Sequence, residues 1–338
     1  ISTVNIGGLI KDIPHRMFCN LPITKLTIPG TVTYIGNDVF NGCTRLNLLT
    51  FEPSETTPAK KLALGYNSDG EEQGPFLDSP LTHVSLNREI EYALASIDLD
   101  AIDEGIFSQK KYLAEVTLGA QVKTLSDYMF AESGTLVDAG ISFVINEGVE
   151  TIGEHVFNSA RFTQITIPAS VTEIKDNAFH YCTKLSSVTF ESGTTPLTIG
   201  FQPNSLDDVG PFYHSPLSYI KLDRELVPSE SYQNELDDWD MGVFTNIHFD
   251  DLDLTTTVNL GANVKTILPW MFSWVRVHNI WIPENVTSIG NYAFFDCMRL
   301  NDVTMGHHTP PAIGTGVFDS CDIFRYIVVR KSALEKYQ

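Results

Sequence analysis

The side chains able to do chemistry in this 338-residue chain are five cysteines, nine histidines and a surplus of carboxylates. The odd number of cysteines argues against a complete disulfide framework. Four of them follow a phenylalanine by three residues, and the fifth follows one directly; they are Cys43, Cys182, Cys297, Cys321 and Cys19. A thiol that recurs at one position of a repeated pattern is more typical of a small buried side chain than of a metal ligand or nucleophile. We therefore expect the cysteines to belong to the core.

The histidines show neither H-x-x-x-H nor H-E-x-x-H, the spacings that place two imidazoles on one metal ion. The pair His307 and His308 precedes the segment TPPAIG and could bind a transition metal, but a solvated loop is the favoured interpretation. The triplet Asn285-Val286-Thr287 fits an N-glycosylation acceptor. Its Val and Thr recur in other copies of the pattern described below, so we interpret Asn285 as a turn residue.

Two acidic clusters are the remaining candidates for chemistry, and they consist of Asp237, Asp238, Asp240 and of Asp250, Asp251, Asp253. Paired carboxylates could catalyse glycoside hydrolysis or hold Ca²⁺. The glycine spacing of a calcium loop is missing, so we expect structural or solvated loops and keep Asp250, Asp251 and Asp253 as a weak calcium candidate. No G-x-S-x-G, P-loop or dinucleotide-binding motif is present. The sequence therefore predicts no catalytic residue and no cofactor.

Carboxylates outnumber basic side chains by 42 to 22, which gives a formal charge of −20 at pH 7. Such a field repels phosphate backbones and anionic lipid headgroups, so nucleic acid and acidic membranes are poor candidates for partners. No apolar run approaches the roughly 18 residues that a membrane span needs. The first residues, ISTVNIGG, show neither the basic nor the apolar region of an export signal.

One pattern recurs thirteen times along the chain. It consists of an apolar-x-apolar triplet, apolar residues four and seven positions later, and a Phe five positions after that. In one copy these residues are Ile280, Ile282, Val286, Ile289 and Phe294. Seven copies keep this spacing strictly, and twelve of the twenty phenylalanines occupy its last position. A residue type used in this way predicts a stacked column of rings.

The apolar alternation predicts a short half-buried strand, which ends at the proline that often follows it. Copies are usually 22 to 24 residues apart, or 27 to 38 where loops are inserted. A unit of this size cannot bury its own apolar face, but stacked units build a continuous core with parallel strands on one side. We therefore expect an α/β repeat solenoid of about 13 turns. Short helices or turns, such as a helical turn at 291–295, would form its other side.

A second, longer period lies above the repeat unit. The segment GPFLDSPLTHVSLNRE, from Gly74 to Glu89, returns as GPFYHSPLSYIKLDRE, from Gly210 to Glu225. This duplication predicts a single solenoid domain over residues 1–338, with five-turn blocks at about 1–139 and 140–276 and a partial block at 277–338. The acidic loops at 52–74, 90–103 and 226–253 are insertions into the plain repeat.

The frame L-x-x-I-x-I-P-x-x-V-T-x-I-G-x-x-A-F-x-x-C-x-x-L, as in Thr24 to Leu46 and Thr163 to Leu185, resembles the BspA-like leucine-rich repeats of gut and oral bacterial surface proteins and of some protozoan parasites. The resemblance covers essentially the whole chain. The C-terminal RYIVVRKSALEKYQ is similar to the last strand and short helix of such arrays. The resemblance implies a right-handed leucine-rich-repeat superhelix. It also implies a non-catalytic secreted or cell-surface protein that binds a protein or glycan of a host or neighbouring cell.

The outward side chains of the predicted strands are mostly threonine, serine and other polar residues. Five members stand out and are our candidates for ligand binding: Leu48, His83, Tyr219, Lys221 and Trp281. Exposed aromatic side chains are the usual anchors of recognition surfaces, although a loop or a neighbouring chain could cover them instead. Two other functions stay open at this point, an enzyme for carbohydrates or calcium-binding module that uses the acidic loops, and a purely structural spacer. The sequence does not indicate an oligomeric state.

Overall fold

The computed structural model describes residues 3–65, 76, 78–93, 105–200, 210–230, 242–245 and 254–337. The chain folds into two compact units, Ile1–Phe162 and Thr163–Gln338, and each is described by itself. The single domain over 1–338 and its division into five-turn blocks stay predictions.

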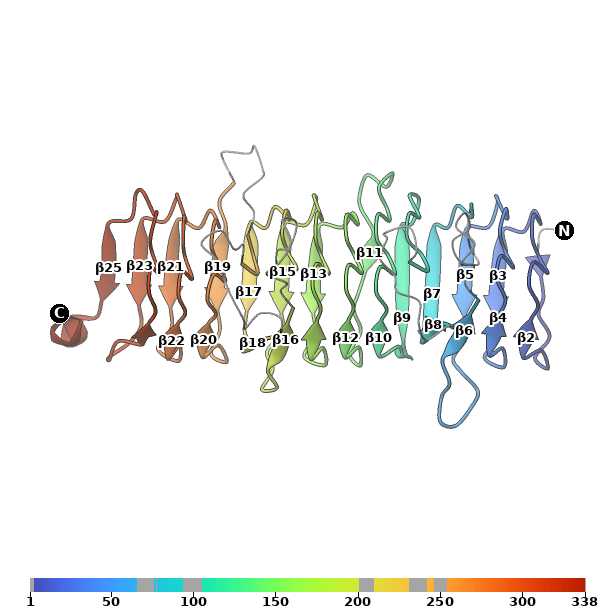
Figure 1. The fold of residues 1–338 in the computed structure, drawn as a ribbon, viewed down its shortest axis with the longest axis horizontal. Helices are drawn as coiled ribbons and strands as arrows, with labels where there is room; N and C mark the ends of the chain where they lie inside the picture. The colour runs from blue at the N-terminus through green and yellow to red at the C-terminus, as the bar shows by residue number, and fades with distance from the viewer. Residues whose placement is uncertain are drawn as a thin grey trace. The chain divides into compact units, whose positions relative to one another are not determined.

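The first unit consists of short parallel strands in two rows (Figure 1). The longer strands form one sheet in chain order: β1 (Thr3–Val4), β3 (Lys25–Ile28), β5 (Leu48–Phe51), β7 (His83–Arg88), β9 (Glu115–Gln121) and β11 (Ser142–Phe143). The second row holds β2 (Asp12–Ile13), β4 (Tyr34–Ile35), β6 (Leu62–Leu64) and β8 (Ile90–Tyr92), and then the pair β10 (Thr124–Leu125) and β12 (Thr151–Ile152). Each coil therefore contributes one strand to each row.

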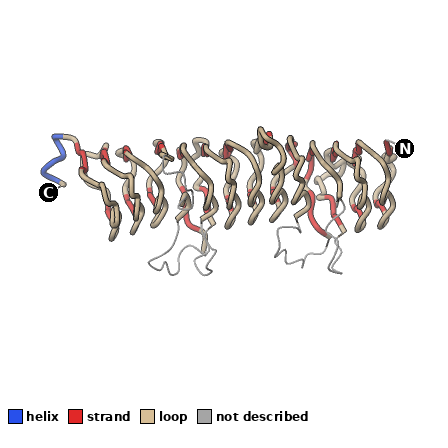
Figure 2. Tube along the Cα trace, turned by 90° about the horizontal axis from the view of Figure 1, so that it is seen from above, coloured by secondary structure: helices blue, strands red, loops and turns tan. Residues whose placement is uncertain are grey.

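The second unit repeats this arrangement. Its longer strands are β13 (Gln164–Ile167), β15 (Ser187–Phe190), β17 (Tyr219–Leu222) and β19 (Thr257–Leu260), followed by β21 (Asn279–Ile282), β23 (Asp302–Met305) and β25 (Tyr326–Val329). The second row holds β14 (Glu173–Ile174), β16 (Leu197–Ile199) and β18 (Leu226–Pro228), followed by β20 (Thr266–Ile267), β22 (Ser288–Ile289) and β24 (Ala312–Ile313). A 3₁₀ helix, η3 (Lys331–Lys336), follows the last strand (Figure 2).

The longer strands are the thirteen predicted from the repeat, and their side chains alternate as expected. In β3 the pattern is exposed, buried, exposed, buried, with Leu26 and Ile28 facing inward. The parallel pairing is in register, so equivalent positions of successive coils form rows along the sheet. The prediction of a repeat solenoid with a parallel sheet is confirmed.

The second row of strands was not predicted, and it is formed by the T-x-I-G part of the repeat. There the inward Ile, such as Ile35 or Ile289, is buried while its neighbour pairs with the adjacent coil. The following glycine lies against the backbone of the coil before it. A Cβ on Gly290 would come within 2.4 Å of the backbone N of Pro269, so only glycine fits this close approach.

The column of phenylalanine rings is confirmed in both units. Successive rings lie with their centroids 4.8 to 5.9 Å apart and with their planes 3° to 27° from parallel. The column of the first unit is Phe18, Phe40, Phe76, Phe107, Phe130 and Phe157, and that of the second is Phe179, Phe212, Phe244, Phe272, Phe294 and Phe318. This spacing is that of offset stacking, which adds to the burial of each ring.

The chain around each column Phe forms turns, and the expected helical turn at 291–295 is absent. At several column Phe residues the residues two positions before and after have left-handed backbone, as at Tyr292 (φ 55°) and Asp296 (φ 50°) around Phe294. This conformation directs alternate N–H groups at the next coil. In one pair of coils the N–H groups of Trp270, Phe272 and Trp274 donate to the carbonyls of Asn291, Ala293 and Phe295, at 2.8 to 3.0 Å. Bonds between coils thus replace bonds within a helix.

The left-handed positions predict a contrast between two nearby glycine substitutions. Ser320 has a φ of 59°, so Ser320→Gly is expected to stabilise the protein by up to about 1 kcal/mol, whereas Ser320→Val is expected to cost about 1–2 kcal/mol. Asp322, two residues on, lacks a positive φ, so Asp322→Gly is expected to destabilise by a few tenths to about 1 kcal/mol. Urea titrations of the three variants measure these differences. Equal effects of the two glycine substitutions would contradict the assigned backbone.

Candidate functional site

The outward face of the longer sheet in the first unit brings two predicted residues together. Leu48 on β5 and His83 on β7 are register partners, and Glu115 on β9 is the register partner of His83. All three side chains point away from the core, because their neighbours along the strands, such as Leu49 and Val84, are buried. An apolar, an imidazole and a carboxylate side chain therefore stand in one row.

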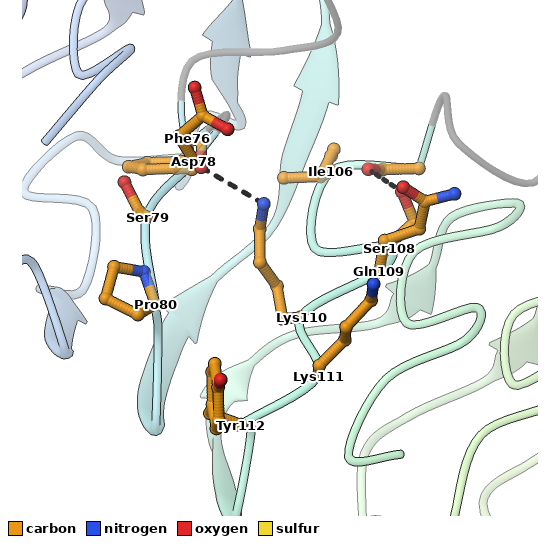
Figure 3. A pocket seen from close by; sticks show the side chains of 11 residues that line it. Phe76, Asp78, Ser79, Pro80, Ile106, Ser108, Gln109, Lys110, Lys111 and Tyr112 are labelled. Carbon is orange, nitrogen blue, oxygen red and sulfur yellow. Dashed lines mark hydrogen bonds between the residues drawn. The ribbon is translucent and has the colours of Figure 1, made fainter. Parts of the chain in front are cut away.

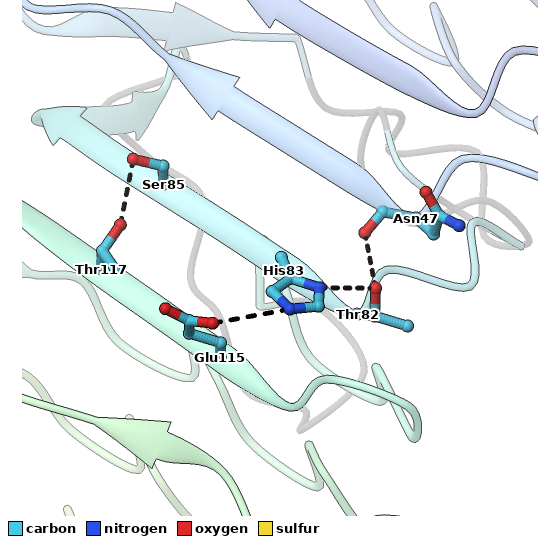
Figure 4. Close-up of polar contacts among 6 residues, drawn as sticks. All are labelled: Asn47, Thr82, His83, Ser85, Glu115 and Thr117. Atoms are coloured by element: carbon cyan, nitrogen blue, oxygen red, sulfur yellow. Dashed lines mark hydrogen bonds and ion pairs between the residues drawn. The ribbon is translucent and has the colours of Figure 1, made fainter. Parts of the chain in front are cut away.

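The polar contacts of His83 position its imidazole ring (Figure 4). Nε2 lies 3.5 Å from Glu115 Oε2, and each side chain is about half exposed. Nδ1 lies 2.8 Å from Thr82 Oγ1, whose hydroxyl donates to the carbonyl of Asn47 at 3.0 Å. A pair this exposed is strongly screened by water and stabilises the fold little, so both side chains remain available to a ligand.

A second row of hydroxyl groups runs beside this pair. Thr117 Oγ1 donates to Ser85 Oγ at 3.0 Å, and Thr50 is the register partner of Ser85 on the other side. The two rows border a shallow hollow of about 210 Å³, with the side chains of Leu48, His83 and Glu115 at one end. Apolar, ionic and hydroxyl groups together can contact the mixed surface of a protein or a sugar.

The order Thr82, His83, Glu115 is that of the nucleophile, base and carboxylate in a hydrolase triad. Two observations argue against that chemistry here. Thr82 donates its hydroxyl proton to a backbone carbonyl and therefore not to the imidazole. The His83 and Glu115 side chains are also about half exposed, so bulk water reaches the pair and weakens its electrostatic interactions. The Thr82 hydroxyl is therefore not held as a nucleophile that His83 could deprotonate.

The second unit carries the other three candidates. Tyr219 and Lys221 are successive outward residues of β17, with Tyr219 half-buried and Lys221 exposed. Trp281 points outward from β21 and is 52% exposed; β19 lies between β17 and β21 (Figure 1). One edge of the indole lies near Gly306, where a Cβ would be 3.3 Å from Cζ2. Gly306 thus leaves room for the ring beside the end of β23.

The sequence alone did not single out two members of these faces. Glu115 appeared as one of many polar ladder residues, and only its contact with His83 distinguishes it. Val144, next to β11, is 66% exposed and is an apolar member of the same face. The strand alternation predicts the outward position of Val144. An apolar residue among mostly Ser and Thr side chains could therefore have marked it as a candidate.

The cysteines lie largely where the repeat placed them. All five are thiols outside any disulfide, with Cys43, Cys182 and Cys297 buried and with Cys19 and Cys321 partly exposed. The two exceptions stand beside Phe18 and Phe318, the first and last rings of the two columns, so a column ring covers each on one side only. Burial raises the pKa of the Cys43 and Cys297 thiols, which makes them poor nucleophiles.

The expectation of a solvated loop is wrong for His307. Its imidazole is buried, and Nε2 lies in hydrogen-bond range of the Val286 carbonyl. His308 is exposed and contacts Arg330 at 2.7 Å. His307 is buried because its loop folds against the preceding coil, a contact that residue spacing does not reveal. The Asn285 amide likewise donates to the carbonyls of Gly261 and Val264, which supports its interpretation as a turn residue.

The acidic clusters at Asp237, Asp238, Asp240 and at Asp250, Asp251, Asp253 lie outside the described residues. Among the residues that the structure does describe, no group of three His, Cys, Asp or Glu side chains could hold a metal ion. Within the same ranges, no helix is both long and apolar enough to cross a membrane.

Two buried arginines were missed by the sequence reasoning. Arg88 is the last residue of β7 and is 1% exposed. Its guanidinium donates to the carbonyls of Pro29, Gly30 and Val32 at 3.1, 3.3 and 2.7 Å. Arg224 is equally buried and donates to the carbonyls of Pro168 and Thr195 at 3.2 and 3.0 Å. Burial lowers the pKa of Arg88 to about 10, so the guanidinium stays charged at neutral pH. The sequence signal that could have revealed these arginines is the Arg-Glu pair that ends both duplicated segments.

The fold and the outward face define a class of protein, a repeat solenoid that presents a parallel sheet as a broad surface. The family model described as the BspA type leucine rich repeat region matches six copies, over residues 1–64, 85–158, 100–226 and 243–336. The chain therefore belongs to the BspA-type leucine-rich repeat family.

A solved structure shows the same fold. It is a leucine-rich repeat protein from Bacteroides ovatus, 20% identical with a TM-score of 0.50, and the match covers 97% of this chain and 84% of that one. A leucine rich cell surface protein from Faecalibacterium prausnitzii is also similar, at 22% identity and a TM-score of 0.35, over 99% of this chain and 88% of that one. A comparison with curated proteins finds no match.

Proposed function

We propose that this chain is a non-catalytic recognition protein, secreted or displayed on a cell surface, that binds a protein or glycan of a host or neighbouring cell through the outward faces of the longer strands in its units. The observation that carries the proposal is Trp281, a large aromatic side chain that is 52% exposed on a mostly polar face. Aromatic side chains that can be buried by a partner supply much of the affinity at recognition surfaces.

The outward face of the first unit also supports this function. The Leu48, His83 and Glu115 row combines apolar area with charge, and the hydroxyls of Ser85 and Thr117 add hydrogen-bonding groups. Register pairing holds these side chains on strands rather than on loops, so little conformational entropy is lost when a ligand binds. The resemblance to bacterial surface repeats supports the proposed localisation.

A binding screen tests the proposal. The purified chain is applied to arrays of glycans and of host extracellular-matrix proteins, and binding to one class of them is expected. If neither array retains the chain at micromolar concentration, a structural spacer becomes the better interpretation.

The Trp281→Ala variant tests whether the face is the binding surface. We expect it to weaken binding of the array hit by about 30-fold, which corresponds to the roughly 2 kcal/mol of a central aromatic contact. Its melting temperature is expected to stay within about 2 °C of the wild type, because a half-exposed strand residue contributes little to the core. Surface plasmon resonance and calorimetry give the two readouts.

Met298→Ala is the matched control. Met298 is 53% exposed but lies in a turn and not on an outward strand. The Met298→Ala substitution therefore removes exposed apolar surface outside the proposed binding face. Binding by Met298→Ala is expected to equal that of the wild type. Equal losses in both variants would show that the hit binds by nonspecific apolar contact, and an unaffected Trp281→Ala would exclude this part of the face.

A further inference from the structure

A hollow of about 320 Å³ lies in the first unit at the turns around Phe76 and Phe107, away from the outward sheet face (Figure 3). Lys110 extends its amine into this region, with Phe76 and Ser79 on one side and Ser108 and Gln109 on the other. Pro80 and Tyr112 also line the hollow, and Tyr112 is 53% exposed. The site therefore combines the amines of Lys110 and Lys111 with hydroxyls, a carboxylate and aromatic rings.

The position of Lys110 in the repeat is unusual. In several other coils a Cys or Ser stands three residues after the column Phe, and its side chain donates to the carbonyl of the preceding column Phe. Cys43 Sγ and Ser133 Oγ do so at 3.3 and 2.8 Å. Lys110 Nζ makes the same contact with the Phe76 carbonyl at 3.1 Å. An amine with three hydrogens and a long stem is not needed for this single bond.

A second observation points to a ligand. Ser79 lines the hollow at 4% exposure, and its Oγ makes no hydrogen bond within the part of the chain that the structure describes. The equivalent Ser215 donates to the Phe179 carbonyl at 2.9 Å. A buried hydroxyl without a partner is costly and is satisfied when a polar ligand accepts its proton.

We propose that Lys110 is a carbonyl-reactive lysine whose amine condenses with a small aldehyde that enters this hollow. The Nζ lone pair attacks the aldehyde carbon, and the carbinolamine that forms then loses water as a C=N bond replaces C=O. The two amine hydrogens leave with the carbonyl oxygen, and no oxidant or reductant is consumed. The Ser79 hydroxyl is available to donate to the aldehyde oxygen or to a hydroxyl on the aldehyde.

The electrostatics of the site favour this reaction over simple binding of an anion. Burial lowers the pKa of Lys110 to about 8, and the carboxylate of Asp78 only partly opposes this effect. At pH 7.5 roughly a quarter of such an amine is neutral, against roughly a thousandth of a lysine with the usual pKa near 10.4. A neutral imine also removes the ammonium charge that burial disfavours.

Reductive labelling tests the proposal on the full chain. The protein is treated with millimolar glyceraldehyde and cyanoborohydride, which reduces the imine to a stable amine, and the labelled lysines are mapped by peptide mass spectrometry. Lys111 is the internal control, because it is adjacent, exposed and lines the same hollow. At pH 7.5 Lys110 is expected to label at least about tenfold faster than Lys111, because the neutral fraction favours it and restricted access removes part of that advantage.

The pH dependence adds a readout that simple accessibility would not give. A lowered pKa gives Lys110 its advantage below about pH 10, and the advantage is expected to disappear at pH 10.5, where an ordinary lysine is also half neutral. Lys110→Arg is expected to abolish the fast phase of labelling, and Lys111→Arg to leave it unchanged. Labelling spread evenly over the lysines at pH 7.5, or faster at Lys111, would overturn the proposal, even if Lys110→Arg failed to fold.

Discussion

Replacing Phe130 with alanine is expected to lower the free energy of unfolding by about 3–5 kcal/mol. The ring is fully buried, with its centroid 5.5 Å from Phe107, 5.9 Å from Phe157 and 5.3 Å from Phe143. The substitution removes apolar area and three ring contacts, and it leaves a cavity that the flanking coils cannot close without breaking their strand pairing. Urea denaturation followed by circular dichroism measures the loss.

Phe318→Ala is the matched control, because Phe318 has the same position in the repeat but is the last ring of its column. It is partly exposed and contacts only Phe294 and Phe324 among the rings of the described residues. Its loss is expected to be less than about half of that at Phe130, since solvent already reaches the site. Equal losses would mean that the column stabilises the array independently of burial, contrary to this account.

Replacing Arg88 with methionine is expected to cost about 2–4 kcal/mol of stability. Methionine fills a similar volume, but it cannot donate to the carbonyls of Pro29, Gly30 and Val32, which belong to the turn two coils earlier. The Pro29 and Gly30 carbonyls also accept from the backbone N–H groups of Val32 and Glu55, so the desolvation cost falls mainly on the Val32 carbonyl. The cost of burying the guanidinium itself is recovered, which keeps the net loss below the sum of the three bonds.

Lys61→Met is the control for the loss of a positive charge. Lys61 pairs with Glu89 and Glu91 at 3.8 and 3.1 Å, but its side chain is about half exposed. The expected loss is at most about 0.5 kcal/mol, because water screens surface ion pairs. Arg224→Met is expected to behave like Arg88→Met. If Arg88→Met unfolded at the same urea concentration as Lys61→Met, the hydrogen bonds from Arg88 to the three carbonyls would not stabilise the fold as proposed.

Both predictions bear on recognition as well as on stability. The Phe column and the buried arginines keep successive coils in register, and this register places Leu48, His83 and Glu115 in one row. A loss of packing beneath the sheet is therefore expected to disturb the binding face without any change in the residues that contact a ligand.

The repeated pattern by itself determined much of this protein. It set the thirteen longer strands, their parallel register, the ring column and the buried positions of Cys43, Cys182 and Cys297. These features follow from local spacing, because each coil can bury its apolar residues only against the same residues of the next coil. The outward positions of His83 and Trp281 follow from the same alternation.

Only the tertiary structure decided the features that depend on where particular side chains reach. The pairing of His83 with Glu115 depends on rotamers as well as on register, and the burial of Arg88 and His307 depends on carbonyls more than 20 residues away along the chain. The left-handed turns of the second face, rather than a helix, arise because the N–H groups bond to the adjacent coil. Spacing along one chain predicts which residues share a layer, but contacts between layers determine what each polar group does there.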